Sequence, residues 1–310
     1  MGKTTTAFAF SLSSFVLSAQ SEPVQYWRLD ESAGTVAHGI PGGSNGDLQN
    51  GAQWDPTGGH HDGACRFDGV NDIIVLGPCD ITTGTGAFSL SLWVKPDFVT
   101  GAERAIIAKT VGPSPTDHIW SLSFVSGTAL RFRMRAGSED MILTSAPSSL
   151  FGGVYYHIAA TYDGAEMAIY LNGSVLATVP ATGSIGYHPE GPATMGNLST
   201  GAAPFSGWLD DVRIYDRALS GDEIIDILLG GELTTGIPEP RPLLLPNGKI
   251  QVPPGAWQSM TVLDAAGRAV KTATLNNTAE PVALDVLPAG LYLVCLQGEG
   301  QRRTWPVVMP

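Results

Sequence analysis

The stretch that decides the fold is Gly207-Trp-Leu-Asp-Asp-Val-Arg-Ile-Tyr-Asp-Arg-Ala-Leu-Ser-Gly-Asp-Glu-Ile225. Its first half places two carboxylates, Asp210 and Asp211, at the start of an apolar strand. Its second half predicts a helix start, because Ser220 can act as N-cap and Glu223 completes a capping box. A buried carboxylate must be paired, neutralised or bound to a metal, so this stretch points to a site as well as to a strand and a helix.

The composition around this stretch favours many short strands. The chain has 310 residues, of which 38 are Gly and 22 are Pro, and long helical runs are missing. The hydrophobic fraction of 43% is enough for a core. The net charge of −12 argues against a nucleic-acid partner, because phosphate binding needs clustered Lys and Arg.

Alternating apolar and polar residues predict strands throughout the first two thirds of the chain. Leu90, Leu92 and Val94 alternate with Ser and Trp over 88–94. Asn172-Gly173 predicts a tight hairpin between strands at 167–171 and 175–179. Further strands are expected at 24–29, 73–76, 105–108, 119–124, 130–134 and 156–162. Many strands and one helix predict an all-β fold, a two-sheet antiparallel sandwich.

We divide the chain into four parts. Residues 1–21 read as a signal peptide, with Lys3 followed by an apolar run over 7–19; the alternative is an uncleaved buried segment. The main domain is 22–231, a Pro-rich linker covers 232–245, and a small C-terminal β-sandwich domain covers 246–310. No later segment is long and apolar enough to cross a bilayer, so the mature chain is expected to have no transmembrane segment.

The cysteine content leaves two alternatives. Cys65 and Cys79 could pair in an exported protein, leaving Cys295 single. Alternatively, all three residues are buried thiols.

The main domain resembles the laminin-G-like, concanavalin-A-like jelly-roll family of bacterial surface and secreted proteins. The segments that carry the resemblance are 26–34, 65–72, 88–96, 156–164, 169–173 and 207–219. The resemblance implies a jelly-roll sandwich whose first and last strands lie together, and often a structural calcium ion.

The C-terminal domain resembles the sorting domain that directs proteins through the type IX secretion system. The segments concerned are 245–252, 262–270 and 284–294. This resemblance implies the secretion machinery as a partner and a secreted or outer-surface location on a bacterium. The alternative is a small accessory β-domain that only packs or spaces.

Three residues are candidates for the calcium site. Asp210 has the strand parity of Val212 and would face the core with it, while Asp30 ends the first strand. If these strands pair antiparallel, the two carboxylates can converge, and the Gly-rich loop around Asn45 can add oxygens. The alternative is that Asp210 pairs with Arg28 or Arg213, or caps a turn.

Catalytic residues are not indicated, because no carboxylates alternate along one strand as glycosidases of this fold would require. We expect sugar or protein ligands to meet aromatic and histidine residues in loops. The candidates are Trp54, His60, His61, His118, Trp120, Tyr187 and His188. The Gly-containing segment 184–190 is most typical of a binding loop, and the alternative is an ordinary edge loop. Trp27, Trp93 and Trp208 are expected in the core.

The first functional hypothesis is a non-catalytic binding or adhesion module for a glycan or surface protein. The alternatives are a polysaccharide hydrolase or lyase on the same fold, and a structural component of a surface layer or filament.

Overall fold

The computed structural model describes the chain with several gaps. The described residues are 22–40, 42, 44–80, 86–99, 101–112, 114, 117–125, 128–136, 139–148, 150–185, 189, 191–229, 242–244, 249–252, 257–264, 268–275, 281–284, 287–288, 290–298 and 301–309. The expected signal peptide, most of the expected linker, Tyr187 and His188 lie outside them.

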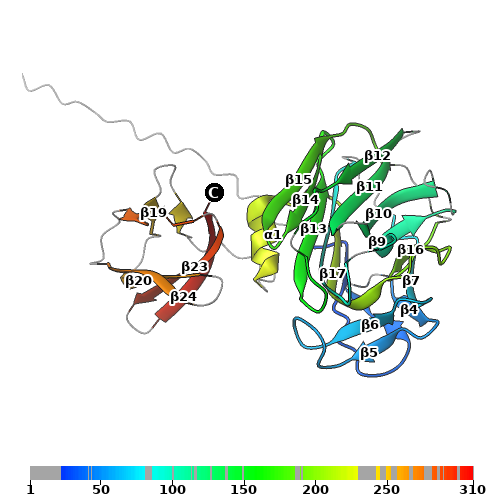
Figure 1. The fold of residues 1–310 in the computed structure, drawn as a ribbon, viewed down its shortest axis with the longest axis horizontal. Coiled ribbons are helices and arrows are strands. Elements are labelled where there is room, and N and C mark those ends of the chain that lie inside the picture. The colour runs from blue at the N-terminus through cyan, green and yellow to red at the C-terminus, as the bar shows by residue number, and fades with distance from the viewer. Residues whose placement is uncertain are drawn as a thin grey trace, which may run out of the picture.

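Two large antiparallel sheets form the main part of the fold (Figure 1). Sheet A has the order β15 (Ser174–Pro180), β14 (Glu166–Leu171), β13 (Tyr156–Tyr162), β8 (Phe88–Pro96), β17 (Ser206–Tyr215), β1 (Gln25–Trp27) and β3 (Gly39–Ile40), with β6 (Ala64–Asp68) beside β17 and β5 (Gln53–Asp55) beside β6. Sheet B has the order β12 (Glu139–Thr144), β11 (Ala129–Ala136), β10 (His118–Val125), β9 (Arg104–Thr110), β16 (Ala193–Met195), β7 (Ile73–Gly77), β4 (Gly46–Gln49) and β2 (Val36–Ala37). The predicted all-β, two-sheet sandwich is confirmed.

The core lies between the two sheets. Strand β8 contributes every second residue from Phe88 to Val94, and β11 contributes Leu130, Phe132 and Met134 in the same way. Successive side chains of a strand point to opposite faces, so the residues between these lie on the outer faces of the sandwich. The two outer faces carry the polar clusters described below.

The strand order also brings the two ends of the main domain together. β1 pairs antiparallel with β17, and Tyr26 lies opposite Arg213. The first and last strands of the sandwich are therefore neighbours, as the family resemblance implied. The predicted hairpin is present as well, with Asn172 and Gly173 at φ of 48° and 80°.

Helix α1 (Gly221–Leu228) follows β17 and covers part of the outer face of sheet A. Ser220 accepts a hydrogen bond from the backbone N of Glu223, whose side chain accepts one from the backbone N of Ser220 at 2.8 Å, so the predicted capping box is present. Such a cap contributes about 0.5–2 kcal/mol. Ile224 and Ile227 pack against Tyr215 of β17. The helix thus lies against a sheet face, not at an edge or end of the sandwich.

The C-terminal residues form two further sheets. One has the order β18 (Leu243–Leu244), β19 (Lys249–Gln251), β22 (Val282–Ala283), and the other β21 (Ala269–Thr274), β20 (Trp257–Leu263), β23 (Gly290–Gly298), β24 (Gln301–Met309). They share a separate apolar cluster that includes Ile250, Met260 and Val294. Strands β20 and β21 form one antiparallel pair, and β23 and β24 form another. Leu243 and Leu244, which we expected in the linker, pair with β19.

Two further expectations concern the state of the cysteines and the presence of a membrane-spanning helix. Cys65, Cys79 and Cys295 are all free and buried, which agrees with the alternative of three buried thiols. Among the described residues, no helix has the length and apolar character that a membrane crossing requires.

Candidate functional site

The acidic pair Asp210 and Asp211 lies on the outer face of sheet A. The pairing of β17 with β8 shifts in register between Asp210 and Arg213, and Asp211 has a left-handed backbone with φ of 53°. This bulge reverses the alternation. Val212 points into the core, whereas Asp210 lies on the outer face opposite Trp93. The predicted shared face of Asp210 and Val212 is therefore wrong.

Asp210 is nevertheless fully buried, because the turn with His60 and His61 lies over it. Its Oδ2 accepts hydrogen bonds from the backbone N of His60 at 2.7 Å and of His61 at 3.0 Å. Its Oδ1 is buried and has no hydrogen-bond partner in the described part of the chain. Burial raises the pKa of Asp210 to about 8, so with no cation nearby the carboxyl group is mostly protonated at pH 7.

Asp30 and Asp211 complete this cluster. Asp30 accepts a hydrogen bond from the backbone N of Gly63 at 2.9 Å, and burial raises its pKa. Asp211 accepts from the Tyr26 hydroxyl and lies 3.1 Å from Nδ1 of His61. We call Asp30, His60, His61, Asp210 and Asp211 the seam cluster.

The structure places Asp30 and Asp210 beside the same segment, since both accept hydrogen bonds from the backbone of residues 60–63. Asn45 is used differently: its Oδ1 accepts from the backbone N of Gly39 at 3.2 Å. Within the described ranges, no three His, Cys, Asp or Glu side chains are grouped so as to hold a metal ion. The free Oδ1 of Asp210 and the carboxylate of Asp30 are nevertheless oxygen donors of the kind that calcium takes.

A row of buried polar groups continues from Asp210 across sheet A. Trp93 of β8 pairs with Asp210 on one side and with His157 of β13 on the other. Trp93 Nε1 and His157 Nδ1 are buried, and the described residues supply no partner for either. The His60 ring stacks on Trp93 with ring centroids 3.4 Å apart. Trp93 is thus buried beneath a loop on the outer face and does not lie in the core between the sheets.

His157 and Ser91 resemble a base and a nucleophile by distance alone. Ser91 Oγ lies 2.9 Å from His157 Nε2. Both side chains are completely buried, and burial lowers the pKa of His157 to about 3. A substrate cannot reach this pair, so we assign it a structural role.

The outer face of sheet B carries a different kind of cluster. Arg131, Arg133 and Arg135 alternate with the core residues of β11 and therefore share the outer face. Across the strand pair, Arg131 lies opposite Ser123 and Arg133 opposite Ser121. His118 joins them, with its Nδ1 3.1 Å from Ser121 Oγ. We call this set the arginine face; its members are His118, Ser121, Ser123, Arg131, Arg133 and Arg135.

Arg133 is the member whose environment is incomplete. It is 8% exposed, its Nε is buried, and no hydrogen bond or ion pair to the described residues holds its guanidinium. Ser123 is fully buried, and its Oγ is likewise without a described partner. Arg131, in contrast, forms an ion pair of 3.0 Å with Glu103. Two buried polar groups with unused donors thus lie on one face.

The predicted ligand-binding residues lie in different environments. Trp120 is 1% exposed and packs in the core with Phe88, so it cannot meet a ligand at the surface. Trp120 has the strand parity of the core residues Leu122 and Phe124, whereas the register shift between His118 and Trp120 puts His118 on the opposite face of the sheet. Trp54 is half-buried on β5 and donates through Nε1 to the carbonyl of Gly34 at 2.9 Å.

The described part of the predicted binding loop lies beside the arginine face. Ile185 forms a β-bridge with Ala136, the residue after Arg135. The loop continues into residues 186–188, which include the predicted Tyr187 and His188 and lie outside the described residues. His118 therefore belongs to the same region as this loop, whereas Trp120 and Trp54 do not contribute to the arginine face.

Trp208 also departs from its expected place in the core. It is half-buried on β17 and donates through Nε1 to Asp55 at 2.8 Å. The Nζ of Lys95 and the guanidinium of Arg66 lie 3.9 and 4.3 Å from its ring. Trp27 is in the core as expected.

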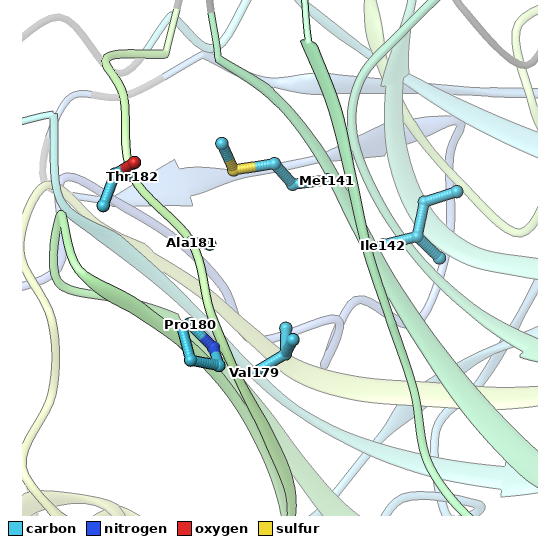
Figure 2. A pocket seen from close by; sticks show the side chains of 6 residues that line it. All are labelled: Met141, Ile142, Val179, Pro180, Ala181 and Thr182. Carbon is cyan, nitrogen blue, oxygen red and sulfur yellow. The ribbon is translucent and has the colours of Figure 1, made fainter.

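A shallow pocket lies where the edge strands of the two sheets approach each other (Figure 2). It is formed by Met141 and Ile142 of β12 and by residues 179–182 at the end of β15. Met141 lies in the opening, whereas Ile142 extends from the other side of β12 (Figure 2). None of the lining side chains is ionisable, so the pocket offers no catalytic group.

Comparison with known proteins identifies the fold family. The laminin G-like family described as the concanavalin A-like lectin/glucanases superfamily matches residues 67–225, just over half of the chain. The match includes both Asp210 and Arg133. No curated protein sequence matches the chain.

Solved structures with a similar fold include the receptor-binding domain of botulinum neurotoxin type G, with 12% identity and a TM-score of 0.51 over 94% of this chain and 79% of that chain. The receptor-binding domain of the mosaic serotype C/D neurotoxin has 12% identity and a TM-score of 0.52 over 93% and 73%.

A sialidase of Trypanosoma rangeli has 18% identity and a TM-score of 0.50 over 68% of this chain, which spans only 33% of the enzyme. At these identities the likeness concerns the fold alone. The sequence match and the two-sheet architecture agree, and the chain belongs to the concanavalin A-like lectin/glucanases superfamily.

Proposed function

We propose that this chain is a non-catalytic carbohydrate-binding module that is secreted or held at a bacterial cell surface. The observation that carries the proposal is the arginine face, where the guanidinium of Arg133, a residue that is 8% exposed, has no hydrogen-bond partner among the described residues. Sugar hydroxyl and acidic groups are hydrogen-bond acceptors that such donors recognise. The family description names lectins and glucanases, which is consistent with a sugar ligand.

Access to this face is provided on the side of β12. Ile142, the cross-strand partner of Arg133, is 48% exposed, and Thr144 beside it is exposed as well. An exposed aliphatic side chain next to buried donors suits a sugar, because a sugar ring has an apolar face and a polar rim.

The alternative of a glycan hydrolase has one observation in its favour, the raised pKa of Asp210, since a general acid must hold a proton near neutral pH. However, Asp210 is fully covered, and two backbone N–H groups occupy its Oδ2. A carboxyl group in that position contributes to stability, and we assign it no substrate contact.

A glycan array separates these functions. The intact protein should bind at least one polysaccharide class while releasing no reducing ends from it. Release of reducing ends that disappears in Asp210→Asn would replace the binding module with an enzyme. Absence of binding to every glycan, together with filaments in electron micrographs, would favour a structural surface component.

A structural calcium ion in the seam cluster is part of the same proposal. Asp210 and Asp30 would hold it, and the positive charge would keep Asp210 ionised. The melting temperature should fall in chelator and recover with added calcium. Asp210→Asn serves as the control, because its melting temperature should no longer respond to calcium. An unchanged melting temperature of the unmodified protein in chelator would contradict the calcium site.

The proposed function also includes export from the cell. Residues 1–21 would act as signal peptide, and residues 246–310 as the sorting domain recognised by the secretion machinery. Deleting 246–310 should retain the protein in the cells. Undiminished release into the medium would make this region an accessory domain.

A further inference from the structure

We infer that the arginine face selects acidic glycans, with the guanidinium of Arg133 binding a carboxylate or sulfate group of the sugar. This inference rests on the proposed carbohydrate binding and adds the chemical class of the ligand. Three observations carry it, each independent of the comparisons.

The first observation is the concentration of positive charge. The chain has 17 Lys and Arg residues against 29 Asp and Glu, yet three arginines occupy alternate positions on one side of β11. Alternate residues of a strand are about 7 Å apart, so the three guanidinium groups repel one another. An arrangement that costs free energy in an otherwise acidic protein indicates that a negative charge is to be bound there.

The second observation is the difference between the middle arginine and its two neighbours. Arg131 has Glu103 as its partner at 3.0 Å, and Arg135 has Asp140 as its cross-strand neighbour. Arg133 has Ser121 on one side and Ile142 on the other, neither of which is acidic. Removing one partner of a buried ion pair destabilises a protein strongly, because the remaining charge is uncompensated. Arg133 is such a charge, and a bound anion would compensate it.

The third observation is the chemistry of the donors around Arg133. A guanidinium presents parallel N–H groups that match the two oxygens of a carboxylate or sulfate. Burial lowers the pKa of His118, and the charge of Arg133 lowers it further, so the imidazole is neutral at pH 7 and adds no competing charge. The exposed Ile142 provides apolar surface for the sugar ring.

The test measures the affinity of the full chain for matched charged and uncharged glycans by calorimetry. The probes are oligogalacturonate, its methyl ester, sulfated and unsulfated dextran, and a neutral glucan series. The unmodified protein should bind a charged member at least tenfold more tightly than its uncharged counterpart. Preference for oligogalacturonate identifies a carboxylate ligand, and preference for sulfated dextran a sulfate ligand.

Three variants locate the effect. Arg133→Gln should lose at least tenfold in affinity for the charged probe, and Arg133→Lys should recover only part of it, because an ammonium cannot bind two oxygens in the same way. Arg268→Gln, which removes an arginine outside the arginine face whose side chain is 81% exposed, is the matched control for charge alone and should lose less than threefold. Melting temperatures within a few degrees of the unmodified protein would establish that the variants fold.

The outcomes separate the inference from the proposed function. Equal binding of charged and uncharged members, or equal losses in Arg133→Gln and Arg268→Gln, overturns the acidic ligand while carbohydrate binding stands. Binding of none of the probes overturns the acidic ligand, and it overturns carbohydrate binding as well if the glycan array is also negative.

Discussion

The two outer faces of the sandwich each bury an ionisable group with an unused bonding position, and the two groups differ in how they can accommodate burial. Asp210 on sheet A can take up a proton, as its pKa of about 8 indicates, or bind a cation. The guanidinium of Arg133 on sheet B has no partner among the described residues, and we propose that an anionic group of the ligand compensates it. On this proposal the first face is complete within the chain, whereas the second is completed by a ligand.

The extent to which other residues cover Asp210 and Arg133 agrees with this difference between the two faces. The turn at His60 and His61 closes over Asp210 with two backbone hydrogen bonds. On sheet B, no described residue accepts a hydrogen bond from the guanidinium of Arg133, and the adjacent Ile142 is exposed. We therefore expect changes in the seam cluster to alter stability and changes on the arginine face to alter binding.

The largest effect is expected from Asp210→Ala. The change removes the acceptor for the backbone N–H groups of His60 and His61, and each buried donor left without a partner costs about 1–3 kcal/mol. The free energy of unfolding in urea should fall by about 3 kcal/mol. Asp210→Asn keeps an acceptor oxygen and should cost less than about 1 kcal/mol in the absence of calcium. Equal stability of the alanine variant and the unmodified protein would contradict the seam role.

The second prediction concerns pH in the absence of calcium. Because the folded state holds the Asp210 proton up to about pH 8, while the ordinary value is 3.8, this group stabilises the fold at low pH. That stability is lost as pH rises from about 4 to about 8. His60 and His157 act oppositely below about pH 6.5, since burial lowers their pKa values to about 4 and about 3.

The measurement is therefore the difference in stability between the unmodified protein and Asp210→Asn across pH 5 to 9. The difference should shift against the unmodified protein as pH rises, and added calcium should remove this trend. A difference that is independent of pH would show that Asp210 is ionised throughout.

A third, smaller effect of opposite sign is expected on the arginine face. Replacing a buried charge by an apolar side chain of similar length is often neutral or stabilising. Arg133→Met should therefore keep or raise the free energy of unfolding, by up to about 1 kcal/mol, while it abolishes binding of the acidic glycan. A loss of more than about 2 kcal/mol would mean that Arg133 serves the fold itself.

The smallest effect is expected from Arg131→Gln. Its ion pair with Glu103 is about one quarter exposed on each side, and such pairs contribute about 1 kcal/mol or less. Thermal unfolding should change by no more than a few degrees. A larger change would place Arg131, rather than Arg133, at the centre of the arginine face.

The sequence predicted the layers of the fold but could not predict which faces some key side chains take. Alternation along the strands identified both sheets, and the capping residues of α1 were found correctly. The bulge at Asp211 reversed the face of Asp210, and a register shift put His118 on the face opposite to Trp120. Both are local backbone irregularities that strand alternation cannot reveal.

The sequence also could not predict which groups contact Asp210 and Arg133. The N–H groups that bind Asp210 come from His60 and His61, about 150 positions earlier, and any residue type can supply a backbone N–H. For Arg133 a signal existed, because arginines alternate with apolar residues over the predicted strand at 130–134. That the middle arginine lacks a partner follows only from the arrangement of neighbouring strands.

The central claim is that the arginine face binds the ligand and the seam cluster stabilises the fold. Its most direct test is an NMR titration of the full chain with the acidic oligosaccharide that binds best. We predict that backbone amide shifts change first for residues of β10, β11 and β12 around Ser123 and Arg133, and that the amides of His60 and His61 stay unchanged. Shift changes centred on His60, His61 and Asp210, with β11 unaffected, would contradict the account by making the seam cluster the binding site.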